Sequence, residues 1–145
     1  MPASTPPPVA QLLETLDYGP APESADRALA WLRSREERFG LFIGGEWTDP
    51  GELFPSFNPA TGARLADLTQ GSHDDVDRAV AAAREAFPGW SGLPGHDRAR
   101  FLYALGRQIQ KHSRLFSVLE TLDNGKPIRE SRDLDIPLVA RHFHH

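Results

Sequence analysis

The 145-residue sequence contains no cysteine, which excludes disulfides, thiolate metal sites and a thiol nucleophile within this chain. It also lacks an excess of positive charge, because 16 basic and 20 acidic residues give a formal net charge of −4. This charge repels phosphate backbones, so we expect no nucleic-acid partner. No apolar run approaches the roughly 20 residues of a transmembrane helix. We therefore expect no membrane span.

The N-terminus carries neither the basic region nor the apolar region of a secretory signal, and we place the protein in the cytoplasm. Residues 1–8 are rich in proline and predict a flexible leader. The hydrophobic content of 39% and the charged content of 25% are typical of a soluble globular protein. The length fits one domain, although it does not show that the domain is complete.

Residues 9–40 predict a helical N-terminal extension. A short helix is expected over residues 9–16, and residues 18–22 form a rigid break that contains Gly19 and two prolines. A second helix is expected over residues 23–38, with Ser24 as its cap. Its apolar residues follow the i, i+3, i+4, i+7 pattern of one helix face. They are Ala25, Ala28, Leu29 and Leu32.

Residues 41–68 change to the pattern of short strands separated by glycine and proline, which predicts a hairpin or meander. The expected strands include residues 41–43 and 65–68. Gly44 and Gly45 can supply the positive φ of a tight turn. Residues 58–62 (NPATG) predict a turn that an Asx side chain begins and a glycine ends.

Helices are predicted for the rest of the chain. Ser72 is a suitable N-cap for a helix that we expect to stop at Pro88 and Gly89. The next helix is expected over residues 97–121, with Asn124-Gly125 as its terminator. Residues 128–145 predict a last helix with Pro137 near a kink. The first of these helices carries an apolar stripe formed by Val76, Ala79, Val80, Ala83 and Phe87.

Several candidate sites are better interpreted as structure. Residues 89–92 (GWSG) lack the G-x-S-x-G spacing of a nucleophile elbow and follow a helix, so they predict a turn. His112 fits the edge of a core better than a general base. Asp133 and Asp135 flank one residue of a predicted helix and so point to different sides. The C-terminal histidines do not converge on one metal ion at their spacing. They are His142, His144 and His145.

Asp123 is less easily explained, since it lies at a predicted helix C-terminus, where a carboxylate is unfavourable without a nearby positive charge. Lys126, a backbone amide or a bound cation would each answer that requirement. The sequence contains no glycine-rich phosphate loop. Residue chemistry alone therefore assigns no catalytic centre to this chain.

Three segments occur in a fixed order: residues 42–47 (FIGGEW), 57–62 (FNPATG) and 119–127 (LETLDNGKP). Together they resemble the N-terminal part of an NAD(P)-dependent aldehyde dehydrogenase, and the resemblance runs over residues 41–145. It implies an α/β fold, here the N-terminal helices and the β-hairpin or meander that precede the Rossmann-like sheet. The segment of residues 11–32 is similar to the leader of the family-16 type. Some members of that type lack the catalytic cysteine.

The resemblance implies a chemistry that these residues do not contain. A complete member oxidises an aldehyde to a carboxylate with NAD or NADP, through a cysteine thiohemiacetal and a glutamate base. Those groups and the pyrophosphate-binding glycines are expected after His145, so this chain has no catalytic or cofactor-binding residue. We expect a truncated, inactive fragment of a homo-oligomer. The alternatives are a non-catalytic binding or assembly module and a full-length pseudoenzyme.

One family site does map onto this chain. Some members bind a monovalent cation through two main-chain oxygens before the Asn-Pro turn and one aspartate carboxylate. The matching positions are Ser56, Phe57 and Asp123. Oxygen ligands suit such an ion. The alternative is an Asp123 that only accepts hydrogen bonds from backbone amides.

Overall fold

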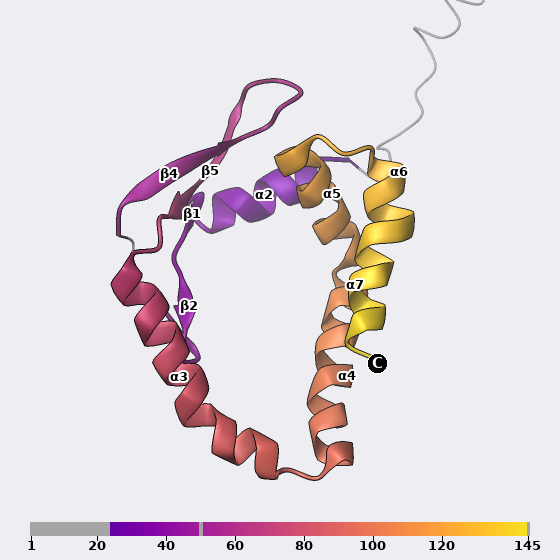
Figure 1. The fold of residues 1–145 in the computed structure, drawn as a ribbon. Coiled ribbons are helices and arrows are strands. Elements are labelled where there is room, and N and C mark those ends of the chain that lie inside the picture. Colours follow the sequence, from indigo (N-terminus) through magenta and orange to yellow (C-terminus); the bar gives the residue numbers. More distant parts are fainter. Residues whose placement is uncertain (1–23, 50, 145) are drawn as a thin grey trace, which may run out of the picture.

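The computed structural model describes residues 24–49 and 51–144 as a mixed arrangement of helices and two small sheets (Figure 1). The predicted leader and the predicted helix of residues 9–16 lie outside the described residues. The first four elements are α2 (Asp26–Ser34), β1 (Arg38–Phe39), β2 (Phe42–Ile43) and β3 (Glu46–Trp47). They are followed by β4 (Leu53–Phe57), β5 (Arg64–Thr69), α3 (His73–Gly92) and α4 (Gly95–Lys111). The last four are α5 (Ser113–Asn124), α6 (Ile128–Glu130), the π-helical segment η1 (Ser131–Asp135) and α7 (Ile136–His142).

Helix α2 is shorter than predicted. Glu36 and Glu37 adopt positive φ angles of 56° and 54°, which end the helical path. The residues that follow form β1 instead of a last helical turn. The N-cap is Ala25 and not Ser24, although the Ser24 hydroxyl accepts a hydrogen bond from the Asp26 N–H at 3.2 Å.

The predicted hairpins are present. Strands β2 and β3 pair antiparallel around Gly44 and Gly45, whose φ angles are 64° and 89°. Strands β4 and β5 also pair antiparallel, and the Asn58 side chain accepts a hydrogen bond from the Ala60 N–H in the turn between them. The sequence did not predict that β1 pairs parallel with β5, which gives the order β1-β5-β4.

Helix α3 begins where predicted and ends later. Ser72 and Asp75 form a reciprocal capping box at its N-terminus. The predicted stop at Pro88 is wrong, because the helix continues to Gly92. Proline lacks an N–H but its fixed φ is compatible with a helix. Residues 89–92 are therefore the last helical turn and not the predicted loop turn.

The helix predicted over residues 97–121 is two helices, α4 and α5. His112 separates them with φ −105° and ψ 15°, and its carbonyl accepts the Phe116 N–H that begins α5. Gly125 ends α5 in the left-handed conformation with φ 77°, as predicted. In the last segment Pro137 lies at the start of α7, and a π-helical turn precedes it where we expected a kink.

The core is small and lies where α2, β5 and α5 meet. Leu32, Leu65 and Ala66 are buried there and are packed by Leu119 and Leu122 of α5. Helix α3 has no buried residue. Its last turn meets α4, where the rings of Trp90 and Phe101 lie with centroids 5.9 Å apart, and the rest of the helix lies away from α4 and α7 (Figure 1). The side chains of its apolar stripe are exposed. Across residues 24–49 and 51–144, no helix combines the length and hydropathy needed to cross a bilayer.

Candidate functional site

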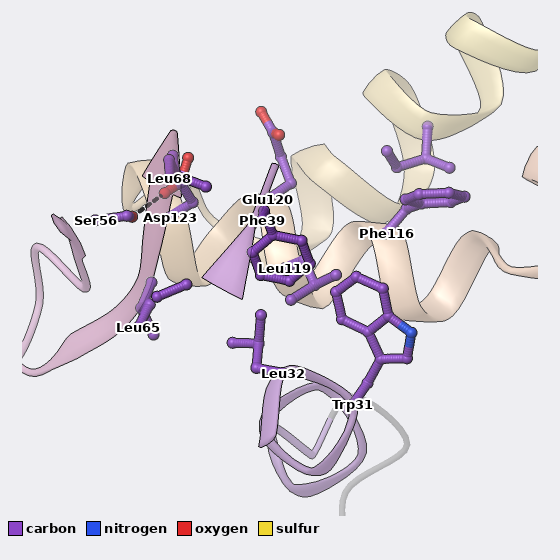
Figure 2. Close-up of a pocket in the computed structure, with 12 residues that line it drawn as sticks. Trp31, Leu32, Phe39, Ser56, Leu65, Leu68, Phe116, Leu119, Glu120 and Asp123 are labelled. Carbon is purple, nitrogen blue, oxygen red and sulfur yellow. Dashed lines mark hydrogen bonds between the residues drawn. The ribbon is translucent and has the colours of Figure 1, made fainter. Parts of the chain in front are cut away.

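A mostly apolar groove of about 300 Å³ lies between the sheet and helix α5 (Figure 2). Its lining combines residues from α2, β1, β4, β5, α5 and α7, so it exists only in the folded chain. The lining residues are Trp31, Leu32, Phe39, Ser56, Leu65, Ala66, Leu68, Phe116, Leu119, Glu120, Asp123 and Ile136.

Helix α5 supplies one wall of the groove. Phe116, Leu119, Glu120 and Asp123 follow the i, i+3, i+4, i+7 spacing, which places them on one face of the helix. The first two are apolar and the last two are acidic, so the wall changes from apolar to negative towards its C-terminal end. The opposite wall is aromatic, since the rings of Trp31 and Phe39 stack with centroids 5.5 Å apart.

Ser56 and Asp123 meet at the acidic end of this groove. The Ser56 hydroxyl donates a hydrogen bond to Asp123 Oδ1 at 2.5 Å, which links β4 to the last turn of α5 (Figure 2). Phe57 follows Ser56 at the end of β4, where the pairing with β5 shifts register between these two residues. The fold thus brings Ser56 and Asp123 into direct contact through the serine hydroxyl, and Phe57 follows Ser56 in the chain.

Lys126 is not the partner of Asp123. Its Nζ lies 2.5 Å from Asp135 Oδ2, and this carboxylate raises the pKa of the lysine. Asp133 instead pairs with Arg132, whose guanidinium lowers the pKa of that carboxyl group. Asp133 and Asp135 therefore have separate cationic partners. Lys126 is thus not the group that stabilises the Asp123 carboxylate in this structure, which leaves a backbone amide or a bound cation from the three candidates considered above.

The histidines do not form a metal site in the part of the chain that the structure describes. No group of three His, Cys, Asp or Glu side chains is placed to hold a metal ion there. His144 packs against Tyr103 with ring centroids 5.0 Å apart, and His145 lies outside the described residues. His112 is half-buried at the junction of α4 and α5.

Most of the groove could not be predicted from the sequence. The one local signal for this wall is the spacing of Phe116 and Leu119 in the helix expected over residues 97–121, since residues three apart share a helix face. That they share a groove with Trp31 and Phe39 depends on how α2 and β1 pack.

None of the residues that line the groove is a cysteine. The lining offers apolar contacts, two carboxylates and the Ser56 hydroxyl, which donates its hydrogen bond to Asp123. The groove therefore suits packing or binding better than covalent catalysis.

Comparison with known proteins identifies the class. The sequence pattern of the Aldehyde dehydrogenase family matches residues 47–145. The structure of HpcC from Thermus thermophilus is similar with a TM-score of 0.78 and 33% identity, over 89% of this chain and 26% of that chain. An NAD+ complex of an aldehyde dehydrogenase from Bacillus cereus gives a TM-score of 0.74 and 34% identity, over 82% and 24%.

A third similar structure is a C291A mutant of AldC from Pseudomonas syringae in complex with NAD+ and octanal. It has a TM-score of 0.69 and 36% identity, over 72% of this chain and 22% of that chain. The fold is therefore the N-terminal part of a dehydrogenase fold. The chain belongs to the aldehyde dehydrogenase family, and it spans about a quarter of the length of the structures it matches.

Proposed function

We propose that these residues are the N-terminal part of a longer NAD(P)-dependent enzyme that oxidises an aldehyde to a carboxylate. The observation that carries this proposal is the match of residues 47–145 to the family together with NAD-bound structural neighbours. In the proposed enzyme a cysteine thiolate attacks the aldehyde, and hydride passes from the thiohemiacetal to the nicotinamide. This chain has no cysteine, so it contributes no nucleophile and is inactive by itself.

The exposed surface of α3 supports a longer protein. Val76, Val80 and Phe87 lie on its apolar stripe and are 59%, 44% and 65% exposed. An amphipathic helix is normally stable because its apolar face packs on another element. The apolar face of α3 has no packing partner among the described residues. This fits a longer protein in which further elements cover that face.

We further propose a monovalent cation at the acidic end of the groove, held by Asp123 and by the main-chain oxygens of Ser56 and Phe57. Two observations support this fit. Asp123 lies in the last turn of α5, where the helix dipole disfavours a carboxylate, and Lys126 is engaged with Asp135. The register shift between Ser56 and Phe57 also disturbs the ladder at the proposed carbonyl ligands. The bound ion would neutralise Asp123 and fix α5 against β4.

The family-16 type, a cytoplasmic location and a homo-oligomeric assembly complete the proposal. The family-16 type rests on the similarity of residues 11–32 to the leader of that type. The location and the assembly rest on what is usual for members of the family. The substrate aldehyde, and the choice between NAD and NADP, depend on residues outside this chain.

The first test is the intact mass of the protein isolated from its source. A mass several-fold above 16.1 kDa, with aldehyde-dependent reduction of NAD or NADP that thiol alkylation abolishes, is the expected result. A long chain with no thiol-dependent turnover would instead identify a pseudoenzyme. If the protein isolated from its source has a mass near 16.1 kDa, this would contradict the enzyme proposal and favour a binding or assembly module.

The cation is tested separately by thermal unfolding at constant ionic strength. Sodium or potassium chloride should raise the Tm above that in tetramethylammonium chloride, whose cation is too large for a site of three oxygens. The Asp123→Asn variant should lose this difference, while Asp133→Asn, which alters a carboxylate paired with Arg132, should keep it. Equal Tm values in all three salts would contradict the cation site and leave the Ser56 hydroxyl as the partner of the Asp123 carboxylate.

A further inference from the structure

A second groove lies between α2 and α5, on the side where the described chain begins. It has a volume of about 160 Å³, enough for a large apolar side chain. Its walls include Ala28 of α2 with Leu115 and Val118 of α5, and Ser24 lies at its edge. Ala28 and Val118 are buried, whereas Leu115 is half-buried and leaves apolar surface open to the groove.

Two guanidinium groups complete the lining of this groove. Arg27 lies on α2 and Arg114 on α5, and both side chains are exposed. Within residues 24–49 and 51–144, neither guanidinium makes an ion pair or a side-chain hydrogen bond. The groove thus offers an apolar floor with positive charge on both helices that border it.

The N-terminal segment has the complementary chemistry. Residues 1–23 include the acidic side chains of Glu14, Asp17 and Glu23 and contain no lysine, arginine or histidine. The apolar residues of this segment recur at the i, i+3, i+4, i+7 spacing of one helix face. They are Val9, Leu12, Leu13 and Leu16. At 100° per residue, Asp17 flanks this face and Glu14 lies near the opposite side.

We propose that residues 9–17 dock their leucine face into the groove between α2 and α5, with Asp17 beside Arg27 or Arg114. The connection is long enough, because the residues between Asp17 and Ser24 span up to roughly 20 Å when extended. Ser24 itself borders the groove, so the segment needs only to fold back on the helix that follows it.

Charge selects this groove over the larger one beside Asp123. The larger groove carries the carboxylates of Glu120 and Asp123 in its lining, which would repel an acidic segment. The groove between α2 and α5 carries two arginines and no acidic residue. An occupant with leucines and carboxylates therefore fits the second groove and not the first.

A zero-length carbodiimide cross-link tests this contact, since the reagent joins a carboxylate to an ammonium group only when the two touch. The native lysines are Lys111 and Lys126. The variants Arg27→Lys and Arg114→Lys keep the charge of the groove and add a reactive amine. Arg84→Lys, on exposed α3, is the matched control. Coupling of Lys126 to Asp135, which are already paired, reports the folded chain in each sample.

The expected result is coupling of Asp17 to position 27 or 114 within a monomer, with little coupling of Glu14 to these positions or of Asp17 to position 84. The double change Leu12→Ser and Leu13→Ser should lower that yield by about tenfold or more, because it removes apolar burial. Absence of Asp17 coupling while Lys126 still couples to Asp135 would overturn the proposal. Coupling found only in cross-linked dimers would overturn it as well and would identify a second copy as the occupant.

Discussion

Ser56 and Asp123 are separated by 67 positions in the sequence and joined by a hydrogen bond of 2.5 Å between hydroxyl and carboxylate. This contact ties the end of β4 to the last turn of α5, at the acidic end of the groove in Figure 2. It is a polar contact between the small sheet and the helical half of the chain. Removing this hydrogen bond therefore tests how much it contributes to the stability of the contact between the sheet and α5.

The Ser56→Ala variant should lower the free energy of unfolding by about 1 kcal/mol, the usual net value of one hydrogen bond. Ser56→Thr keeps the hydroxyl and should lose less. Urea denaturation compares the three proteins. A loss for Ser56→Thr as large as that for Ser56→Ala would show that packing at β4, and not the hydroxyl, carries the effect.

Gly125→Ala should destabilise the protein by about 1–3 kcal/mol, because a side chain must then adopt a left-handed conformation. Its φ is 77°, and an added Cβ would lie 2.8 Å from Pro59 Cγ. Gly89→Ala is the matched control, since an added Cβ there meets nothing within 4 Å inside helix α3. That control should be neutral or stabilising by up to about 1 kcal/mol. Equal denaturation midpoints for the two variants would contradict the assigned role of Gly125.

The capping box makes the first turn of α3 sensitive to acid. Hydrogen bonds from Ser72, and then Arg78, lower the pKa of Asp75 from 3.8 to about 2. A lowered pKa stabilises the folded state above the unfolded pKa, so this contribution is complete above about pH 4 and is lost as the pH falls towards about 2.

Amide hydrogen exchange across the first turn of α3, followed against pH, measures this effect. Asp75→Asn should remove the acid-dependent step and leave the turn less protected at neutral pH. Asp74→Asn changes a carboxylate of the same turn that is outside the capping box, and it should keep the step. An unchanged pH profile for Asp75→Asn would show that another group controls the turn.

Leu32→Ala tests the core. Leu32 is 6% exposed and packs with Leu65 and Ala66, so truncation should cost about 2–5 kcal/mol in the free energy of unfolding. Val76→Ala removes apolar atoms from α3, where the side chain is 59% exposed, and should change stability by about 0.5 kcal/mol or less in this chain. A large loss for Val76→Ala would show that its helix face is covered in solution.

The sequence by itself determined the local features. The capping box of Ser72 and Asp75 needs residues three positions apart, and the turn at Gly44 needs a residue that tolerates positive φ. Gly125 ends α5 for the same reason. Each feature is fixed by neighbouring residues, so it could be predicted. The ordered segments also led to the family, and through it to the pairing of Asp123 with the region of Ser56.

Only the tertiary structure decided how these elements meet. The sequence pattern predicts a helix up to residue 38, yet residues 38–39 pair with β5, because the positive φ angles at Glu36 and Glu37 turn the chain towards the sheet. The break at His112 directs α5 onto α2, and helix periodicity alone does not reveal it. The groove between sheet and helix follows from those two changes of direction. Local propensity acts over a few residues, whereas the contacts that form the groove join α2 to residues far along the chain.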